Sequence, residues 1–350
     1  MQLLIEADKA RGFGQIFMAG VFESLARVLP LAPDLLQMLE TWPGNLADAG
    51  LIFRLNAGLH ALARGDRHPG LAAIYRGAVR MTEPDPLALD LALTIALCEG
   101  EDTLRHWLSG PTQTNEVARI AGLAALLLEL DARRPMETEL LELGASAGLN
   151  LNLARYDIRL GGGRCGEPGS PVQIAPRWLG PTPPAARLRL GATRGVDLNP
   201  LDVREAADSE RLQAYIWPGE PARSARLQAA ITLAHRHPPQ VARGRAGSWL
   251  GAALAEPQAD GVRRVVFHSM VLQYLPPAER ETLAETLAAA GAAATPARPL
   301  VRVGLEWNDD RSRVDVTATQ WHGGSGSGQP VIVAHCHPYA EWFEWRGLPD

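Results

Sequence analysis

The sequence predicts an α/β protein: an N-terminal helical domain, then a doubly wound, mostly parallel sheet of seven strands. Two observations predict this class. Up to about residue 135, apolar residues recur at helical spacing, and from Thr138 onward short apolar runs alternate with helical segments. Such alternation is typical of a parallel sheet with helices on both faces. We therefore expect a helical lobe at 1–135 and an α/β domain at 136–350.

The first lobe is predicted from apolar segments that prolines separate. Residues 14–29 and 35–39 carry apolar side chains at helical spacing, and Pro30 and Pro33 lie between them. Residues 117–130 are apolar nearly all round, which is typical of a buried helix.

The α/β domain is predicted from five short apolar runs with helical segments between them. The expected strands are 139–143, 192–196, 240–242, 264–268 and 300–305. The expected helices are 147–155, 205–215, 222–235, 248–255 and 277–290. Two more strands, 314–321 and 330–335, are expected to pair antiparallel through a glycine-rich hairpin tip. Residues 156–190 are rich in Gly and Pro, which indicates an insertion folded as a small β-subdomain.

Composition narrows the class of protein. The chain has 350 residues, a formal net charge of -5 and three cysteines, too few for a disulfide framework or a zinc site. It shows no bilayer-length apolar run, no signal-peptide pattern and no basic stripe interleaved with aromatics. We expect a cytoplasmic protein that binds neither membranes nor nucleic acid. The aromatic tail at 339–345 indicates core closure or a homodimer contact.

The segment E-L-G-A-S-A-G at 142–148 is the most informative part of the sequence. An apolar strand ends in the carboxylate Glu142, and a loop of small residues follows. Gly144 and Gly148 permit a tight turn and the close approach of a ligand to the backbone. The next helix is expected to begin near Ala147 and to direct its free N–H groups at the ligand.

This segment resembles the first motif of class I methyltransferases, which bind S-adenosylmethionine. A second strand ends at Asp197, whose carboxylate can accept two hydrogen bonds from a ribose diol. Residues 265–277 resemble the fourth strand and following loop of small-molecule methyltransferases. The residues expected to hold the cofactor are Glu142, Gly144, Ala145, Ser146, Gly148, Asn150, Asp197, Leu198 and Asn199.

Two other interpretations of the loop stay open. Residues 144–148, G-A-S-A-G, formally match the nucleophile elbow of an α/β-hydrolase, with Ser146 as nucleophile and His335 or His337 as its base. Against it, that fold places several strands before its nucleophile, and residues 1–135 offer none. A dinucleotide site ranks last, because its glycine spacing differs and Asp197 lies too far downstream.

The remaining candidate residues come from strand ends and from one polar string. His268, at the end of the fourth strand, is the candidate base, and Tyr274 the candidate wall of the substrate pocket. The residues expected to line the cleft are Gln113, Asn115, Glu116 and Glu306. His335 and His337 share one face of a strand, but without a third ligand we expect no metal.

Over nearly its full length, the chain resembles an uncharacterised bacterial family, domain of unknown function 2332. The resemblance depends on P-T-Q-T-N-E-V at 111–117, E-L-G-A-S-A-G-L-N at 142–150 and D-L-N-P-L-D-V at 197–203. The strings V-F-H at 266–268 and Y-L-P-P at 274–277 complete it. It implies a methyltransferase-like fold with a helical N-terminal lobe, and it implies no reaction.

Two residues depart from the methyltransferase pattern. Ser146 stands where a glycine is usual, and Arg245 stands where an acidic residue often contacts adenine, although Arg has no acceptor. Despite these two departures, we predict from the strand-end motifs a methyltransferase that uses S-adenosylmethionine on a small molecule. The alternatives are a non-catalytic binding protein with the same fold and, third, the Ser146 hydrolase.

Overall fold

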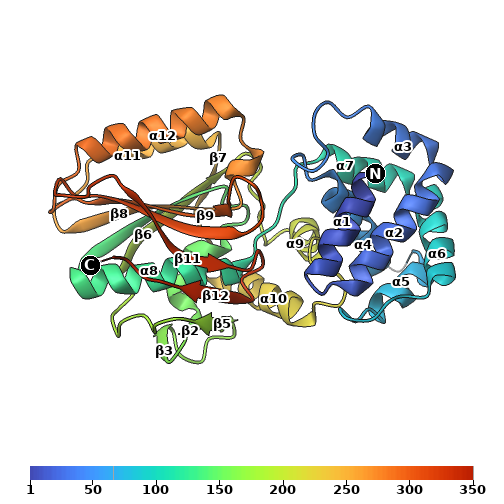
Figure 1. The fold of residues 1–350 in the computed structure, drawn as a ribbon, viewed down its shortest axis with the longest axis horizontal. Helices are drawn as coiled ribbons and strands as arrows, with labels where there is room; N and C mark the ends of the chain where they lie inside the picture. Colours follow the sequence, from blue (N-terminus) through green and yellow to red (C-terminus); the bar gives the residue numbers. More distant parts are fainter. Residues whose placement is uncertain (66, 350) are drawn as a thin grey trace. The chain divides into compact units, whose positions relative to one another are not determined.

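The chain folds into two units. The computed structural model describes residues 1–65 and 67–349 (Figure 1). One unit consists of Met1–Thr114 and Arg204–Ala225, and the other of Asn115–Val203 and Arg226–Asp350. The sequence placed a single boundary near 135. In the structure the buried helix α8 (Ile120–Arg133) belongs to the second unit, and the segment Arg204–Ala225 belongs to the helical one.

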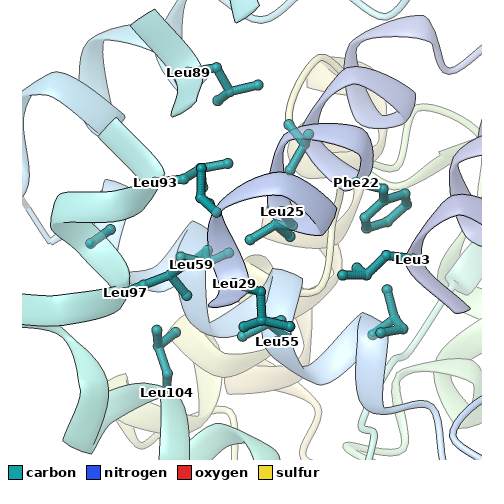
Figure 2. Packing of buried hydrophobic residues seen from close by; sticks show 14 of the residues in the cluster. Leu3, Phe22, Leu25, Leu29, Leu55, Leu59, Leu89, Leu93, Leu97 and Leu104 are labelled. Atoms are coloured by element: carbon teal, nitrogen blue, oxygen red, sulfur yellow. The ribbon is translucent and has the colours of Figure 1, made fainter. Parts of the chain in front are cut away.

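The first unit is helical, as the apolar spacing predicts. Its helices are α1 (Gln2–Gly12), α2 (Ile16–Val28), α3 (Pro33–Glu40), α4 (Leu51–Arg64), α5 (Pro69–Arg76), α6 (Pro86–Glu99), α7 (Glu101–Ser109) and α9 (Ala206–Ala214). Leucines of α2, α4 and α6 meet in its core, among them Leu25, Leu55 and Leu93 (Figure 2). Trp217 stacks on Phe53 with ring centroids 6.0 Å apart, which anchors the returning segment in this core.

The second unit contains a mixed sheet in the order β5-β12-β11-β10-β9-β8-β1-β6-β7. Its strands are β1 (Glu137–Leu143), β5 (Arg177–Leu179), β6 (Leu190–Asp197), β7 (Val241–Arg243), β8 (Val262–Ser269), β9 (Leu300–Trp307), β10 (Val314–Trp321), β11 (Pro330–Cys336) and β12 (Trp342–Trp345). The sheet therefore has nine strands instead of the expected seven. The two additional strands are β5, from the insertion, and β12, from the aromatic tail, which pair with each other.

The strands β7, β6, β1, β8 and β9 are parallel, whereas β10, β11 and β12 continue antiparallel. From β1 the chain passes to β6 and β7 on one side, and then returns to β8 and β9 on the other. In open α/β sheets, such a reversal opens a crevice beyond the carboxyl ends of the two central strands. The carboxyl ends of β1 and β8 are therefore the place to examine for a site.

Helices cover both faces of this sheet. Leu250 of α11 (Ala246–Ala255) and Leu283 of α12 (Pro277–Ala292) pack with Leu141 and Val266 on one face (Figure 1). On the other face, α8 packs so closely that a Cβ added at Gly122 would lie 3.1 Å from Phe343. Helix α10 (Pro221–Arg236) contains the boundary between the two units.

Residues of the expected insertion form a second, three-stranded sheet. It consists of β2 (Asp157–Leu160), β3 (Gly163–Gly166) and β4 (Gln173–Ile174) in the order β3-β2-β4. The buried carboxylate of Asp157 accepts two hydrogen bonds from Arg164, at 2.7 and 2.6 Å. These bonds hold the pKa of Asp157 low, at about 2, against the opposing effect of burial.

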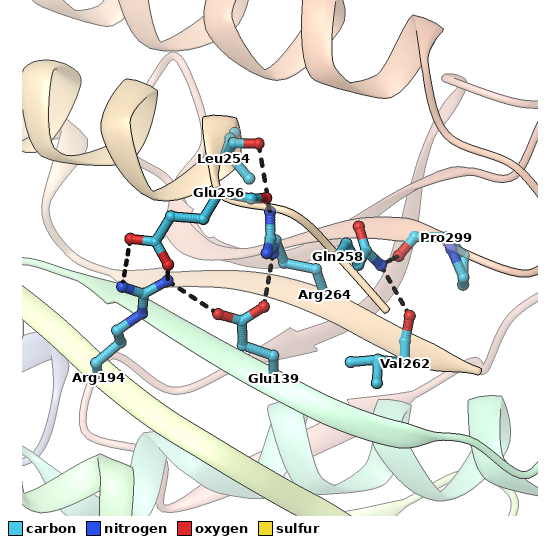
Figure 3. Close-up of polar contacts among 8 residues, drawn as sticks. All are labelled: Glu139, Arg194, Leu254, Glu256, Gln258, Val262, Arg264 and Pro299. Carbon is cyan, nitrogen blue, oxygen red and sulfur yellow. Dashed lines mark hydrogen bonds and ion pairs between the residues drawn. The ribbon is translucent and has the colours of Figure 1, made fainter. Parts of the chain in front are cut away.

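An ion network closes the amino-terminal part of the sheet (Figure 3). Glu139 of β1 accepts from Arg194 of β6 at 3.0 Å and from Arg264 of β8 at 2.7 Å. Arg264 also donates to the carbonyl oxygens of Leu254 and Glu256, where α11 ends. The network joins three strands to a helix end and satisfies carbonyl groups that a helix terminus leaves free.

None of the helices in the described ranges is, by itself, long and apolar enough to cross a membrane. One pair, Ile16–Leu31 and Pro33–Glu40, passes on length and composition alone, but it is bent by 109°. Core residues such as Phe17, Leu25 and Leu35 are buried inside the helical unit, which accounts for their apolar character.

Candidate functional site

The turn after β1 lies at the reversal point of the sheet, and Asp197 holds its shape. Gly144 and Gly148 have φ angles of +64° and +69°, and Ser146 takes +54°, a conformation that L-residues rarely adopt. One carboxylate oxygen of Asp197, at the end of β6, accepts from the Ser146 amide at 2.8 Å. Its other oxygen accepts from the Asn199 amide, also at 2.8 Å. The two strand ends are thus joined through one carboxylate.

The glycines of this turn serve packing as well as backbone conformation. A Cβ added at Gly144 would lie 2.5 Å from Val271, and one added at Gly148 would lie 2.6 Å from Val241. The turn is as tight as the sequence predicts. The space beside these two glycines, which we expected to admit a ligand, is filled by protein side chains. Ala145 is also buried, against the backbone of Gly195.

Glu142 and Asn150 form a buried pair next to this turn. The Asn150 amide donates to Oε1 of Glu142 at 2.7 Å, and both side chains are almost fully buried. Burial raises the pKa of Glu142 to about 8, and the charge of Asp197 acts in the same direction, although the bond from Asn150 opposes it. Glu142 is therefore mostly protonated at neutral pH.

Three polar atoms of this group, buried within it, lack a partner among the residues that the structure describes. They are Oε2 of Glu142, Oγ of Ser146 and Oδ1 of Asn150. Buried polar atoms are normally hydrogen-bonded, since leaving one unpaired costs about 1–3 kcal/mol. Three such atoms around one turn therefore mark a place where a ligand or water molecules can complete the hydrogen bonding. We call Glu142, Ser146 and Asn150 the Glu142 cluster.

The segment after the turn is a 3-10 helix, Leu149–Arg155, where the sequence predicted a helix from Ala147. The Tyr156 hydroxyl donates to the carbonyl oxygen of Leu149, so that carbonyl is already used at the start of the segment. The first free amide, that of Leu149, does not face a ligand. It donates to Oδ1 of Asn115 at 3.1 Å.

Asn115 and Glu116, the polar residues before α8, therefore stabilise neighbouring backbone segments. Asn115 fixes the start of the 3-10 helix Leu149–Arg155, and Glu116 caps the short 3-10 helix Val117–Arg119 by accepting from the Ala118 amide at 3.2 Å. Glu116 also accepts from Arg226 at 3.0 Å. Gln113 is buried in the helical unit, whereas Asn115 and Glu116 belong to the α/β unit.

The residues beyond Asp197 form an exposed rim. Leu198, directly after β6, is 60% exposed. Asn199 accepts from Arg243 through its side-chain oxygen at 2.9 Å. Arg245, which departs from the methyltransferase pattern, pairs with Glu279 in the first turn of α12.

His268 lies at the same edge of the sheet but on its other face. In the register of β1 with β8, Leu143 pairs with His268, whereas Glu142 pairs with Phe267. Because side chains alternate along a strand, Glu142 and His268 point to opposite faces. We expected both in one cleft, and the register separates them.

Both ring nitrogens of His268 are occupied. Arg302 donates to Nε2 at 3.0 Å, so Nδ1 carries the proton and donates to Glu306 at 2.6 Å. The ring is 1% exposed, and its burial lowers the pKa of His268. A base needs a free nitrogen within reach of the substrate. In place of the base that we expected, the geometry makes His268 a residue that positions Glu306.

Glu306 in turn holds the loop that follows β8. Its Oε1 also accepts from the amides of Val271, at 3.0 Å, and Leu272, at 3.4 Å. Gly304 makes this arrangement possible, since an added Cβ would lie 2.7 Å from the His268 ring. Met270, at the start of the loop, has a φ of +57°. Tyr274, the expected pocket wall, is 44% exposed on the same loop.

Among the described residues, no hydrolase triad is assembled around Ser146, whose hydroxyl has no hydrogen-bond partner. His335 of β11 donates from Nδ1 to Asp315 of β10 at 2.6 Å, which resembles the second half of a triad. However, β11 lies four strands from β1, a separation of about 19 Å at about 4.8 Å per strand. In the described ranges, no group of three or more His, Cys, Asp or Glu residues has the geometry of a metal site.

Sequence reasoning missed three residues of these clusters. Arg302 donates to His268, Val271 fills the space beside Gly144, and Tyr156 donates to the carbonyl oxygen of Leu149, which follows Gly148. Arg302 was detectable in principle, because a charged residue inside the apolar run of β9 must have a buried partner. Gly304, two residues later in the same strand, indicates close packing against a neighbour.

The fold and the turn define an α/β protein with a mostly parallel sheet and a polar cluster at its reversal point. Comparison with known proteins gives the family. Residues 3–345 match the family described as an uncharacterized protein conserved in bacteria, domain of unknown function 2332. The match covers nearly the whole chain, so the protein belongs to this family, as its sequence motifs predicted. No curated protein matches the chain.

Proposed function

We propose that this protein is a methyltransferase that uses S-adenosylmethionine and acts on a small molecule. The observation that carries the proposal is the Glu142 cluster, with its three unpaired buried polar atoms at the reversal point of the sheet. Ligands of open α/β sheets bind at this position, beyond the carboxyl ends of the central strands.

The residues present fit the parts of an adenosyl ligand. Each oxygen of Asp197 accepts one backbone bond and retains a lone pair, so the carboxylate can also accept from the two hydroxyls of a ribose. The exposed Leu198, next in sequence, offers an apolar surface for a purine ring. The unpaired atoms of the Glu142 cluster suit a polar group at the other end of the ligand.

One contact must change before the ligand can lie along the turn. Val271 fills the space beside Gly144, so the loop after β8 has to move away from the turn. Its first residue, Met270, has the left-handed backbone conformation, which costs about 1–3 kcal/mol at a non-glycine residue.

The chain contributes mainly position to the reaction. When bound, S-adenosylmethionine supplies an electrophilic methyl group on a positively charged sulfur. The nucleophile and the methyl group must be brought into line, which is a matter of orientation. Since His268 has no free nitrogen, we expect a substrate whose nucleophile carries no proton at neutral pH, such as a carboxylate.

The test is calorimetric titration of the full chain with S-adenosylmethionine and with S-adenosylhomocysteine. We expect micromolar affinity, and binding at least tenfold weaker in Asp197→Asn, because an amide cannot accept at both positions. The matched control is Asp260→Asn, an exposed aspartate of the same unit that pairs with Arg298. If neither compound binds, or if both variants bind equally well, the proposal is wrong.

A second candidate function is ligand binding without catalysis. It is favoured by the engagement of both His268 nitrogens and by the arginine at position 245, which pairs with Glu279. The distinguishing measurement is formation of S-adenosylhomocysteine with a panel of small-molecule nucleophiles. Tight binding with no turnover across that panel would support the second candidate.

A further inference from the structure

Helix α6 of the helical unit is apolar on two opposite faces. Three of its leucines, Leu89, Leu93 and Leu97, belong to the core of that unit (Figure 2). On the other face the large side chains are exposed to solvent. They are Leu87, Leu91 and Ile95, with exposed fractions of 81%, 65% and 42%. Packing inside the unit therefore does not account for the apolar character of this second face.

The exposed residues form one continuous stripe along the helix. Residues four apart in a helix lie on the same face, which places Leu87, Leu91 and Ile95 in one row. Ala88 and Cys98 are also exposed and extend the row. We call these five residues the α6 stripe, and none of them is charged. Single exposed apolar residues are ordinary, whereas a contiguous apolar face indicates a surface that binds a partner.

The charges around the α6 stripe narrow the choice of partner. Helix α6 contains no basic residue, and basic residues are what attract an apolar helix to an anionic membrane. Asp90, on the flank of the stripe, accepts from Arg27 of α2 at 3.0 and 2.8 Å, so this pair is neutral. A surface without net charge fits another uncharged apolar surface, and an identical stripe is such a surface.

The α6 stripe is also symmetric in its spacing. Leu87 and Ile95 lie four residues to either side of Leu91. A two-fold axis at Leu91 therefore packs two antiparallel α6 helices so that Leu87 of each copy meets Ile95 of the other. Glu83 and Glu99 lie exposed at the two ends of the stripe, where physiological salt screens their repulsion.

Helix α5 widens the apolar face beside the stripe. Its exposed residues Gly70 and Ala73 are small, and a Cβ added at Gly70 would lie 4.0 Å from Ala92 of α6. The stripe is about 17 Å long at about 1.5 Å per residue, and two helices are about 20 Å wide, which gives on the order of 350 Å² per copy. A standard interface covers about 800 Å² per copy, so we expect a weak dimer with a micromolar dissociation constant.

We propose that the protein forms a homodimer through the α6 stripe, with the two copies of α6 antiparallel about a two-fold axis at Leu91. The sequence pointed to the aromatic tail as a contact between copies, but Phe343 and Trp345 of that tail are buried. The α6 stripe, in contrast, is exposed. This inference concerns the helical unit and is independent of the function proposed above.

The first test is sedimentation velocity of the full chain over a series of micromolar concentrations in physiological salt. We expect a reversible equilibrium between monomer and dimer. Leu91→Glu places two charges against each other at the axis and should weaken dimerisation at least about tenfold. The matched control is Leu4→Glu, the same change at a leucine of α1 that is 50% exposed, and it should dimerise like the unmodified protein. A monomer at all concentrations, or an equal effect of both variants, would overturn the inference.

The second test locates the axis by oxidation to a disulfide in a Cys98→Ser background, in which the remaining Cys165 and Cys336 are buried. In Leu91→Cys the two copies of residue 91 face each other, within the about 4.4–6.8 Å between Cα atoms that a disulfide spans. In Leu87→Cys the two copies of residue 87 lie about 12 Å apart along the helices, which is too far. We expect a covalent dimer with the first variant and a monomer with the second. Cross-linking that is equal at the two positions, or faster at residue 87, contradicts the inference.

Discussion

The Glu142 cluster and the His268 group, which consists of His268, Arg302 and Glu306, lie at the same edge of one sheet but on opposite faces. They differ in how their hydrogen bonds are completed. Glu142, Ser146 and Asn150 leave three buried polar atoms without a partner. His268, by contrast, is bonded at both nitrogens, by Arg302 and Glu306. A satisfied buried group stabilises the fold, whereas an unsatisfied one carries a desolvation cost that a ligand or a water molecule would remove. The difference between a supporting residue and a candidate site residue therefore depends more on whether its hydrogen bonds are complete than on its residue type.

The largest expected effect tests the protonation of Glu142 through stability. Its pKa is raised from 4.5 to about 8 in the folded protein. The folded state therefore binds more protons than the unfolded state between these values, and stability falls as pH rises through that window. From pH 5 to pH 8, the unmodified protein should lose about 3.5 kcal/mol more than Glu142→Gln, as measured by urea unfolding.

The opposite outcome would reverse the comparison between the two clusters. If both proteins lose stability in parallel from pH 5 to pH 8, Glu142 is already ionised when folded. The cluster then resembles the His268 group, with its charge balanced inside the protein.

The next effect tests the support assigned to His268. In His268→Ala, Arg302 loses its acceptor while its guanidinium remains largely buried, and the ring leaves a cavity. We expect a loss of about 3 kcal/mol in the free energy of unfolding. The control is His237→Ala, a half-buried histidine of the same unit, which should change stability by about 0.5 kcal/mol or less. Equal losses in the two variants would argue against a special role for His268.

The smallest effect concerns the support beneath the turn. Asn115→Ala removes the acceptor of the Leu149 amide, and we expect a loss of about 1 kcal/mol, typical of a lost helix cap. Asn115→Asp keeps an acceptor oxygen and should stay close to the unmodified protein. Amide hydrogen exchange at Leu149 reports the change locally. Unchanged exchange in Asn115→Ala would show that this contact does not hold the turn.

Much of the fold could be predicted from the sequence, and the reason is visible in particular strands. The central strands β1 and β8 each contain a short apolar run, Leu140–Leu141 and Val265–Phe267, and a polar residue of the clusters, Glu142 or His268, follows that run directly. The pairing of β10 with β11 was predicted and is confirmed. The additional strands β5 and β12 are short; β12 forms a hairpin with the preceding β11, whereas β5 pairs with β12 from far away in the sequence, and no local pattern reveals that pairing.

The sequence predicted which residues meet at the candidate site, but not how they pack there. Glu142, Ser146, Asn150 and Asp197 do meet around the turn, because the ends of neighbouring parallel strands share one edge. The space beside Gly144 and Gly148 could not be foreseen, because it is filled by Val271 and Val241 from other strands or loops.

By itself, the sequence determined an α/β protein with a helical unit and acidic side chains at two adjacent strand ends. These follow from periodicity and from residue types, which act over a few neighbours. Only the tertiary structure decided that Glu142 is buried among atoms that do not satisfy it, and that His268 points to the other face, bonded to Arg302 and Glu306. Burial and hydrogen bonding depend on residues far apart in the chain, and these two properties set whether a buried acid keeps its proton.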